Sequence, residues 1–91
     1  MDEAAIIAAV DRLNEQLQLL PNWVPCGIDG LYPEFDYADH GPDMYLALVE
    51  VEMCEAEGRL MRAEEGEKEA LTRLVTMLMQ CAIALREAGV E

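Results

Sequence analysis

The stretch that decides the fold is residues 43–88, DMYLALVEVEMCEAEGRLMRAEEGEKEALTRLVTMLMQCAIALREA. Its apolar residues recur at alternating steps of three and four, the spacing that places side chains on one side of an α-helix. Two such series are present, separated by the polar segment 64–69. Their members are Leu46, Val49, Met53, Ala56, Leu60 and Ala63, followed by Leu71, Leu74, Leu78, Cys81, Leu85 and Ala88. The pattern predicts two helices, about residues 43–64 and 67–89, with Asp43 as the N-cap of the first.

The polar segment between these two helices has two interpretations. Gly66 favours a turn there, and the helices would then form an antiparallel hairpin. However, counting in steps of seven from Leu46 leads through Glu67 to Cys81, so the second apolar series keeps the register of the first. One unbroken helix requires such a constant register. Such a helix of about 46 residues would be roughly 70 Å long and would need a partner to bury its apolar side. We favour the hairpin, with one continuous helix in a dimer as the alternative.

A third amphipathic segment, about residues 2–20, precedes this pair. Asp2 is its candidate N-cap and Pro21 its candidate stop. The apolar residues at helical spacing are Ile6, Val10, Leu13, Leu17 and Leu20. The fold predicted for the chain is all-α, a three-helix bundle forming one acidic domain, 1–91. The last helix is the most apolar, so we expect it to be central, with the other two packed on either side of it.

Residues 21–42 are predicted to be a loop, because seven Pro and Gly residues within this range exclude a long helix. The loop holds every aromatic residue except Tyr45. Long loops of this kind fold over a core or present a binding surface. The aromatic residues concerned are Trp23, Tyr32, Phe35 and Tyr37.

The charge of the chain limits the kinds of partner that it can bind. There are 19 acidic residues against six Lys and Arg, a net charge of −13. Binding to nucleic acid requires a basic footprint, so we expect no direct binding to DNA or RNA, and anionic membranes would repel the chain. The most apolar run, Met77 to Leu85, is far shorter than the ~18 residues of a membrane span.

Three cysteines, Cys26, Cys54 and Cys81, lie far apart in the sequence and form no C-x-x-C pair. A disulfide framework or a thiolate zinc site is therefore not indicated. The N-terminus opens with Asp2 and Glu3 rather than with the basic residues of an export signal. We expect a cytoplasmic protein.

The densest group of chemically active residues precedes the second helix. It comprises three carboxylates and the only His, namely Asp36, Asp39, His40 and Asp43. Oxygen ligands suit hard cations, and Mn, Fe or Zn would accept the His as well. The spacing matches no metal motif, and Asp, Gly and Pro are typical of turns and N-caps. We therefore predict a capping loop here, with no metal and no cofactor.

Glu52-x-x-Glu55, followed by Glu64 and Glu67, resembles the all-helical nucleotide pyrophosphohydrolases, whose E-x-x-E and E-x-x-D pairs on facing helices hold magnesium. The resemblance covers these four acids alone. No Asp follows Asp43 in this chain, and the second pair falls in the expected turn. The chain also lacks Ser, so nucleophilic catalysis has few candidate residues. We predict no catalytic residues, and a metal-dependent nucleotide hydrolase is the third interpretation of function.

The leading interpretation is a small protein-interaction module. Glu50, Glu57 and Glu64 recur every seven residues along one flank, with Glu52 and Glu55 nearby. Pairs at i,i+4 are expected between Glu55 and Arg59 and, in a continuous helix, between Glu64 and Lys68. The other acids, Glu50, Glu52 and Glu57, have no basic residue at i+4, and such unpaired acids suggest a requirement beyond folding.

This acidic surface, with the aromatic loop beside it, is expected to dock on a basic surface of a partner protein, such as one that binds nucleic acid. The chain is similar, in size and charge only, to phage-encoded inhibitors, including anti-CRISPR proteins that mimic nucleic acid. The predicted partner-binding residues are Glu50, Glu52, Glu55, Glu57, Trp23, Tyr32, Phe35, Asp36, Tyr37 and Asp39. The alternative is a self-associating structural or ligand-binding module, because Met79 and Ile83 fall toward the polar side of the last helix and suggest a contact with a second subunit.

Overall fold

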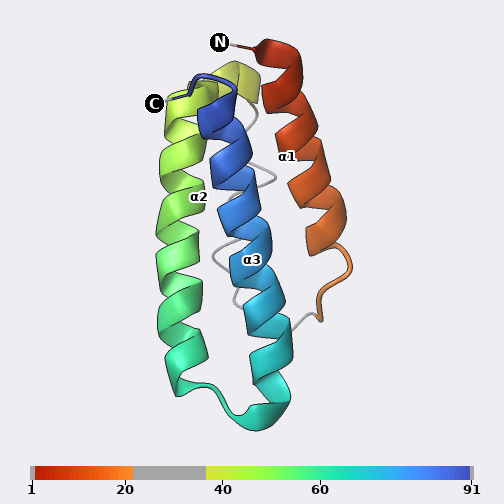
Figure 1. The fold of residues 1–91 in the computed structure, drawn as a ribbon, viewed down its shortest axis with the longest axis vertical. Coiled ribbons are helices and arrows are strands. Elements are labelled where there is room, and N and C mark those ends of the chain that lie inside the picture. The colour runs from red at the N-terminus through yellow and green to blue at the C-terminus, as the bar shows by residue number, and fades with distance from the viewer. Residues whose placement is uncertain (1, 22–36, 91) are drawn as a thin grey trace.

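The structure is a computed structural model that describes residues 2–21 and 37–90, with only the backbone of 37–40. The described residues form three α-helices: α1 (Glu3–Leu17), α2 (Tyr37–Arg62) and α3 (Glu65–Glu87). α2 and α3 form an antiparallel hairpin, and α1 packs on the other side of α3 (Figure 1). The all-α bundle with the last helix at its centre is therefore confirmed.

The core of the bundle is built from the predicted apolar series. Every member of the series in α3 is buried, from Leu71 to Ala88. From α2, Leu46, Val49 and Ala56 are buried, and Met53, Leu60 and Ala63 pack against the core. Ile6 and Leu13 are the corresponding buried residues of α1. Burial of one side of each helix explains why the 3.6-residue period is so clear in the sequence.

The chain reverses at Ala63 and Glu64, so the alternative prediction of one continuous helix is wrong. Glu64 is the N-cap residue of α3 and has an extended backbone (φ −77°, ψ 161°), whereas Gly66 lies inside the first turn of α3. Charge accounts for this position: α2 ends with Arg59 and Arg62, and α3 begins with acids. Cations at a helix C-terminus and anions at an N-terminus are stabilised by the helix dipole. The prediction that Gly66 makes the turn was thus two residues late.

The start of α2 also differs from the sequence prediction. The segment 37–40, expected in a loop that extended to 42, is helical, and the helix is interrupted at Gly41, whose φ of 77° lies in the left-handed region that favours glycine. Pro42 follows this break, where its missing N–H removes no helical hydrogen bond. Asp43 therefore lies within the first turn of the longer part of α2 rather than at its N-cap.

The two ends of the described chain are held together. Asp2 caps α1 as predicted, because its Oδ1 accepts a hydrogen bond from the Ala5 N–H at 3.2 Å. α1 ends at Leu17, three residues earlier than expected. At the end of α3, Gly89 (φ 99°) allows the Val90 N–H to donate to the Leu85 carbonyl oxygen at 3.0 Å, the hydrogen bond of a Schellman motif. The Asp2 N–H donates to the Ala88 carbonyl oxygen at 2.8 Å, which joins α1 to α3.

None of the helices in the described part of the chain is both long and apolar enough to cross a membrane.

Candidate functional site

The four glutamates predicted to form one acidic surface lie on two flanks of α2. A helix turns by about 100° per residue, so Glu57 lies within roughly 20° of Glu50, but Glu52 and Glu55 are turned from Glu50 by about 160° and 140°. The buried residue Val49 lies between the two pairs. The structure thus brings together Glu50 and Glu57, and separately Glu52 and Glu55. Glu64, expected on the flank of Glu50, lies outside α2 as the N-cap of α3.

Glu50 has a partner that its own helix does not supply. Its Oε1 accepts a hydrogen bond from Nη2 of Arg86 in α3 at 2.6 Å. The interpretation of Glu50 as an unpaired acid is therefore corrected. The pair of Glu64 with Lys68, expected only in a continuous helix, does not form in the hairpin, where Lys68 pairs with Glu65 at 3.6 Å instead.

The remaining acids of α2 have different surroundings. Among the described residues, no ion pair within 4 Å involves Asp43, Glu55 or Glu57, so the expected pair of Glu55 with Arg59 is not formed. Glu52 is partly buried, and this burial, followed by the charge of Glu55, raises the pKa of its carboxyl, while Arg59 acts in the opposite direction. Burial of Glu52 thus disfavours the charged form of its carboxyl.

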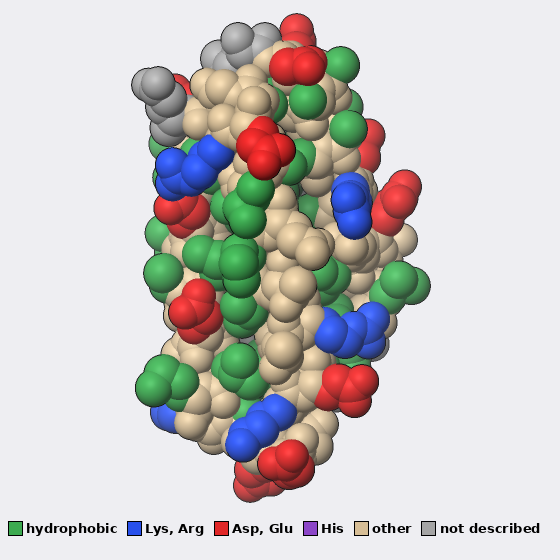
Figure 2. All heavy atoms as spheres, in the orientation of Figure 1, with side chains coloured by type: hydrophobic (Ala, Val, Ile, Leu, Met, Phe, Trp, Pro, Cys, Tyr) green, Lys and Arg blue, Asp and Glu red, His purple; other side chains and the backbone are tan. Residues whose placement is uncertain are grey.

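Exposed apolar side chains accompany the acids on the Glu50 flank. From α3, Met79 and Ile83 are 43% and 49% exposed, and from α2, Met61 is 89% exposed. Cys54 is exposed as well. In Figure 2, hydrophobic side chains form a band over α2 and α3 with acidic groups beside it. We call this surface the seam face and define it as Asp43, Glu50, Cys54, Glu57 and Met61 of α2 with Met79, Ile83 and Arg86 of α3.

The predicted aromatic contacts lie outside the described residues. These are Trp23, Tyr32 and Phe35, together with Asp36. Of Tyr37 and Asp39 the structure describes the backbone in the first turn of α2, but not the side chains. Their assignment to partner binding stays a prediction.

Neither of the two candidate metal-ligand groups considered from the sequence is assembled by described residues. Within residues 2–21 and 41–90, no three His, Cys, Asp or Glu side chains are grouped so that they could hold a metal ion. For the cluster before the second helix, only Asp43 has a described side chain. The four acids that resemble the pyrophosphohydrolase pairs are all described, but Glu64 and Glu67 lie at the hairpin turn, about 10 Å along the axis from Glu55.

The two described cysteines lie in contrasting surroundings. Cys54 is exposed on the seam face, whereas Cys81 is buried between α3 and α1. The Cys81 Sγ–H donates to the Ala9 carbonyl oxygen at 3.9 Å, and burial raises the pKa of the thiol to about 11. A thiol with such a pKa is protonated and inert at neutral pH, so Cys81 is a packing residue. Its burial agrees with the place of Cys81 in the apolar series predicted for the last helix.

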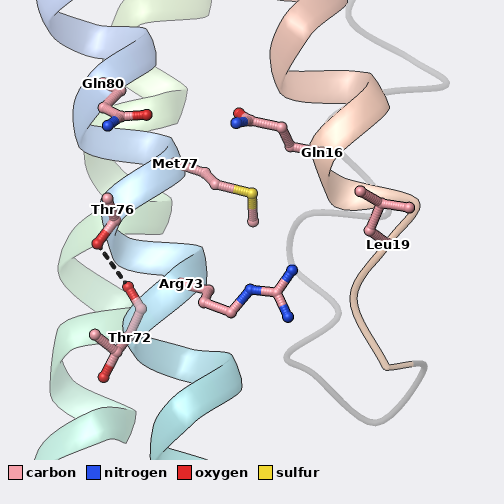
Figure 3. A pocket seen from close by; sticks show the side chains of 7 residues that line it. All are labelled: Gln16, Leu19, Thr72, Arg73, Thr76, Met77 and Gln80. Carbon is pink, nitrogen blue, oxygen red and sulfur yellow. Dashed lines mark hydrogen bonds between the residues drawn. The ribbon is translucent and has the colours of Figure 1, made fainter.

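A second surface feature, between α1 and α3, was not predicted. A hollow of about 280 Å³ is lined by Gln16 and Leu19 from the end of α1 and by Arg73, Thr76, Met77 and Gln80 among the residues of α3 (Figure 3). A smaller hollow of about 40 Å³ adjoins it and includes Arg12. We call the two together the α1–α3 groove. None of the described residues that line either hollow is an Asp or Glu.

Little in the sequence indicates that a groove would form here. Arg73 and Gln80 stand outside the apolar series predicted for the last helix, and both are exposed. What the sequence did not show is that α1 ends beside them and closes one side of a hollow.

Compared with models of known protein families, with curated proteins and with solved structures, the chain matches none of them. The functional argument therefore rests on the surfaces described above.

Proposed function

We propose that this chain is a small interaction module, an inhibitor or regulator, that binds a partner protein through the seam face. The partner surface carries basic side chains around an apolar centre. The observation that supports this most directly is the arrangement of Met61, Met79 and Ile83, exposed apolar side chains on two helices, beside the acids of α2.

The charge of the seam face supports a basic partner. Asp43 and Glu57 are exposed and have no ion pair with another described residue, whereas Glu50 is neutralised by Arg86. A net charge of −13 on 91 residues adds a long-range attraction for a basic surface. Such steering accelerates encounter and selects the partner by charge, while affinity comes from buried apolar side chains.

The apolar residues of the seam face supply those anchors. Met side chains are flexible and adapt to surfaces of different shape, so Met61 and Met79 suit a docking role. Ile83 has a β-branched, stiffer side chain that is 49% exposed. A basic patch that normally binds nucleic acid has the required chemistry, and occupation of it would block the nucleic acid, as phage-encoded anti-CRISPR inhibitors do.

The test uses matched charge reversals on α2. Glu57→Lys changes the seam face, and Glu55→Lys makes the same change, at an equally exposed glutamate of the same helix, on the other flank. Proteins captured from a lysate of the source cells by the wild-type chain and by Glu55→Lys are expected to be lost with Glu57→Lys and at high salt. Equal capture by the two variants would contradict the seam face as the docking surface.

A second arm tests the apolar part and the competing function. Ile83→Glu is expected to abolish capture, whereas Ile7→Glu on α1, where Ile7 is 44% exposed, leaves it intact. Light scattering of the purified chain then tests self-association. A stable dimer that Ile83→Glu converts to a monomer would show that the seam face binds a second copy, and would overturn the proposal of a different partner.

A further inference from the structure

We propose that the α1–α3 groove binds a small amphipathic carboxylate, whose carboxylate group is held by Arg73. This site is separate from the seam face, and the inference does not depend on the proposed function.

The direction of the Arg73 side chain is the first observation. Glu69 lies four residues before Arg73 on the same helix, which is the favourable order for an i,i+4 ion pair. No ion pair within 4 Å joins Arg73 to a described acid. Instead, its guanidinium extends from α3 toward the end of α1, across the hollow (Figure 3). An arginine held toward a hollow presents a planar set of N–H donors that matches a carboxylate.

Further donors meet in the same hollow. The side chains of Gln16 from α1 and Gln80 from α3 extend toward one another across the gap between the helices (Figure 3). Thr76 does not add a donor, because its Oγ1 already donates to the Thr72 carbonyl oxygen at 2.9 Å. The groups left to bind a carboxylate are therefore one guanidinium, two amides and the Thr72 hydroxyl. Arg12 adds a second positive charge in the adjoining hollow.

The hollow has an apolar part as well, which indicates that the ligand is amphipathic. Met77 is 7% exposed and forms part of its buried wall, and Leu19, at the rim, is 73% exposed. An apolar tail on these two side chains would remove them from water. The volume of about 280 Å³ is near the lower end of the ~300–1,000 Å³ of ligand pockets, so the ligand is small.

Local charge outweighs the net charge at this site. The chain as a whole repels anions, but screening limits the effect of exposed charges to about 8 Å at physiological ionic strength. Of the lining residues that the structure describes, two are arginines and none is an acid. The ligand class that follows is a short aliphatic carboxylate rather than a polyanion, which would reach the acids beyond the groove.

The test is a titration of the ¹⁵N-labelled chain with octanoate, followed by NMR, with 1-octanol and octylammonium as matched ligands that lack the carboxylate. Octanoate is expected to give saturable shifts of the amide signals of Gln16, Arg73, Thr76 and Gln80. Arg73→Gln is expected to weaken octanoate binding ~10-fold or more, because it removes a charge-assisted hydrogen-bond pair. Arg59→Gln, an equivalent change on α2 outside the groove, should leave binding unchanged. Arg73 is exposed, and the NMR spectrum of each variant confirms its fold.

Three outcomes would overturn the proposal. They are the absence of saturable shifts with octanoate, equal binding of octanoate and 1-octanol, and equal binding of octanoate to Arg73→Gln and Arg59→Gln. None of them bears on the seam face, so this proposal and the proposed function fail or succeed separately.

Discussion

α3 is packed on both sides, and the two sides differ in what they leave at the surface. Toward α2, the contact is long, and its margin carries exposed methionines, Ile83 and acids. Toward α1, the contact is shorter, and its margin carries two arginines and two glutamine amides around a hollow. One helix therefore separates an acidic, apolar face from a groove whose charged groups are basic. The net charge of −13 describes neither surface, because it averages over both.

The largest loss of stability is expected from a change that disrupts the packing of α3 against both α1 and α2. Leu78 of α3 is 0% exposed in the shared core. Leu78→Ala should lower the free energy of unfolding by about 2–5 kcal/mol, since it removes buried methyl groups and leaves a cavity. Urea unfolding followed by circular dichroism measures this loss. Met61→Ala, at an 89% exposed position, should change stability by less than ~0.5 kcal/mol. Similar losses for the two variants would show that α3 is not the central helix.

The next largest effect is a pH dependence of stability that is expected for Cys81 but not for Cys54. The Cys81 thiol in the α1–α3 contact has its pKa raised to about 11, from an ordinary 9.0. The unfolded chain then loses this proton at lower pH than the folded protein. The stability that the neutral thiol contributes is fully present below about pH 9 and is lost as pH rises toward 11, by up to ~1.4 kcal/mol per unit.

This alkaline loss is measured as the difference between the unfolding free energies of the wild type and Cys81→Ala across that pH range. The same difference for Cys54→Ala, on the exposed seam face, should stay constant with pH. An equal slope for the two variants would mean that Cys81 is not buried.

A smaller effect concerns the ion pair that joins α2 to α3 on the seam face. The side chains of Arg86 and Glu50 are 56% and 38% exposed, so water screens their attraction. A double-mutant cycle with Glu50→Gln and Arg86→Gln should give a coupling energy of about 0.2–1 kcal/mol. The coupling should decrease with added salt. A coupling of zero at low salt would place Glu50 among the unpaired acids after all.

The smallest effect compares the two flanks of α2. The fold raises the pKa of the Glu52 carboxyl, first by burial, and therefore disfavours its charge. Glu52→Gln should increase the melting temperature at neutral pH slightly, equivalent to at most ~0.5 kcal/mol. The gain should vanish in acid, where Glu52 is protonated in both states. Glu57→Gln, on the seam face, is the control with no expected gain, and a loss of stability in Glu52→Gln would contradict the burial argument.

The helices and the core could be predicted from the sequence because helix periodicity is a local property. The series from Leu46 to Ala63 and from Leu71 to Ala88 are buried or packed against the core, as their spacing predicts. Asp2 was recognised as a cap for the same reason, since a cap bonds to a residue three positions away. Boundaries were less well predicted. Gly66 was taken as the turn, but opposite charges on either side of Ala63 and Glu64 agree with a turn two residues earlier.

The surfaces could be predicted only in part. Met79 and Ile83 were expected on the outside of α3, and they are exposed there. The grouping of Glu50, Glu52, Glu55 and Glu57 did not follow from their closeness in sequence, because two residues of separation place side chains on nearly opposite sides of a helix. The α1–α3 groove requires residues about 60 positions apart to meet, and no local pattern indicates such a meeting.

By itself, the sequence determined three amphipathic helices, their buried sides and a net charge of −13. These follow from residue spacing and composition, which the chain carries whatever its tertiary arrangement. Only the tertiary structure decided that Arg86 neutralises Glu50, that Arg73 lies along a hollow beside Gln16, and that Cys54 is exposed while Cys81 is buried. Each of these depends on where the chain reverses and which side of α3 receives each neighbouring helix. Those choices bring together side chains that are remote in sequence, and they separate an acidic face from a basic groove.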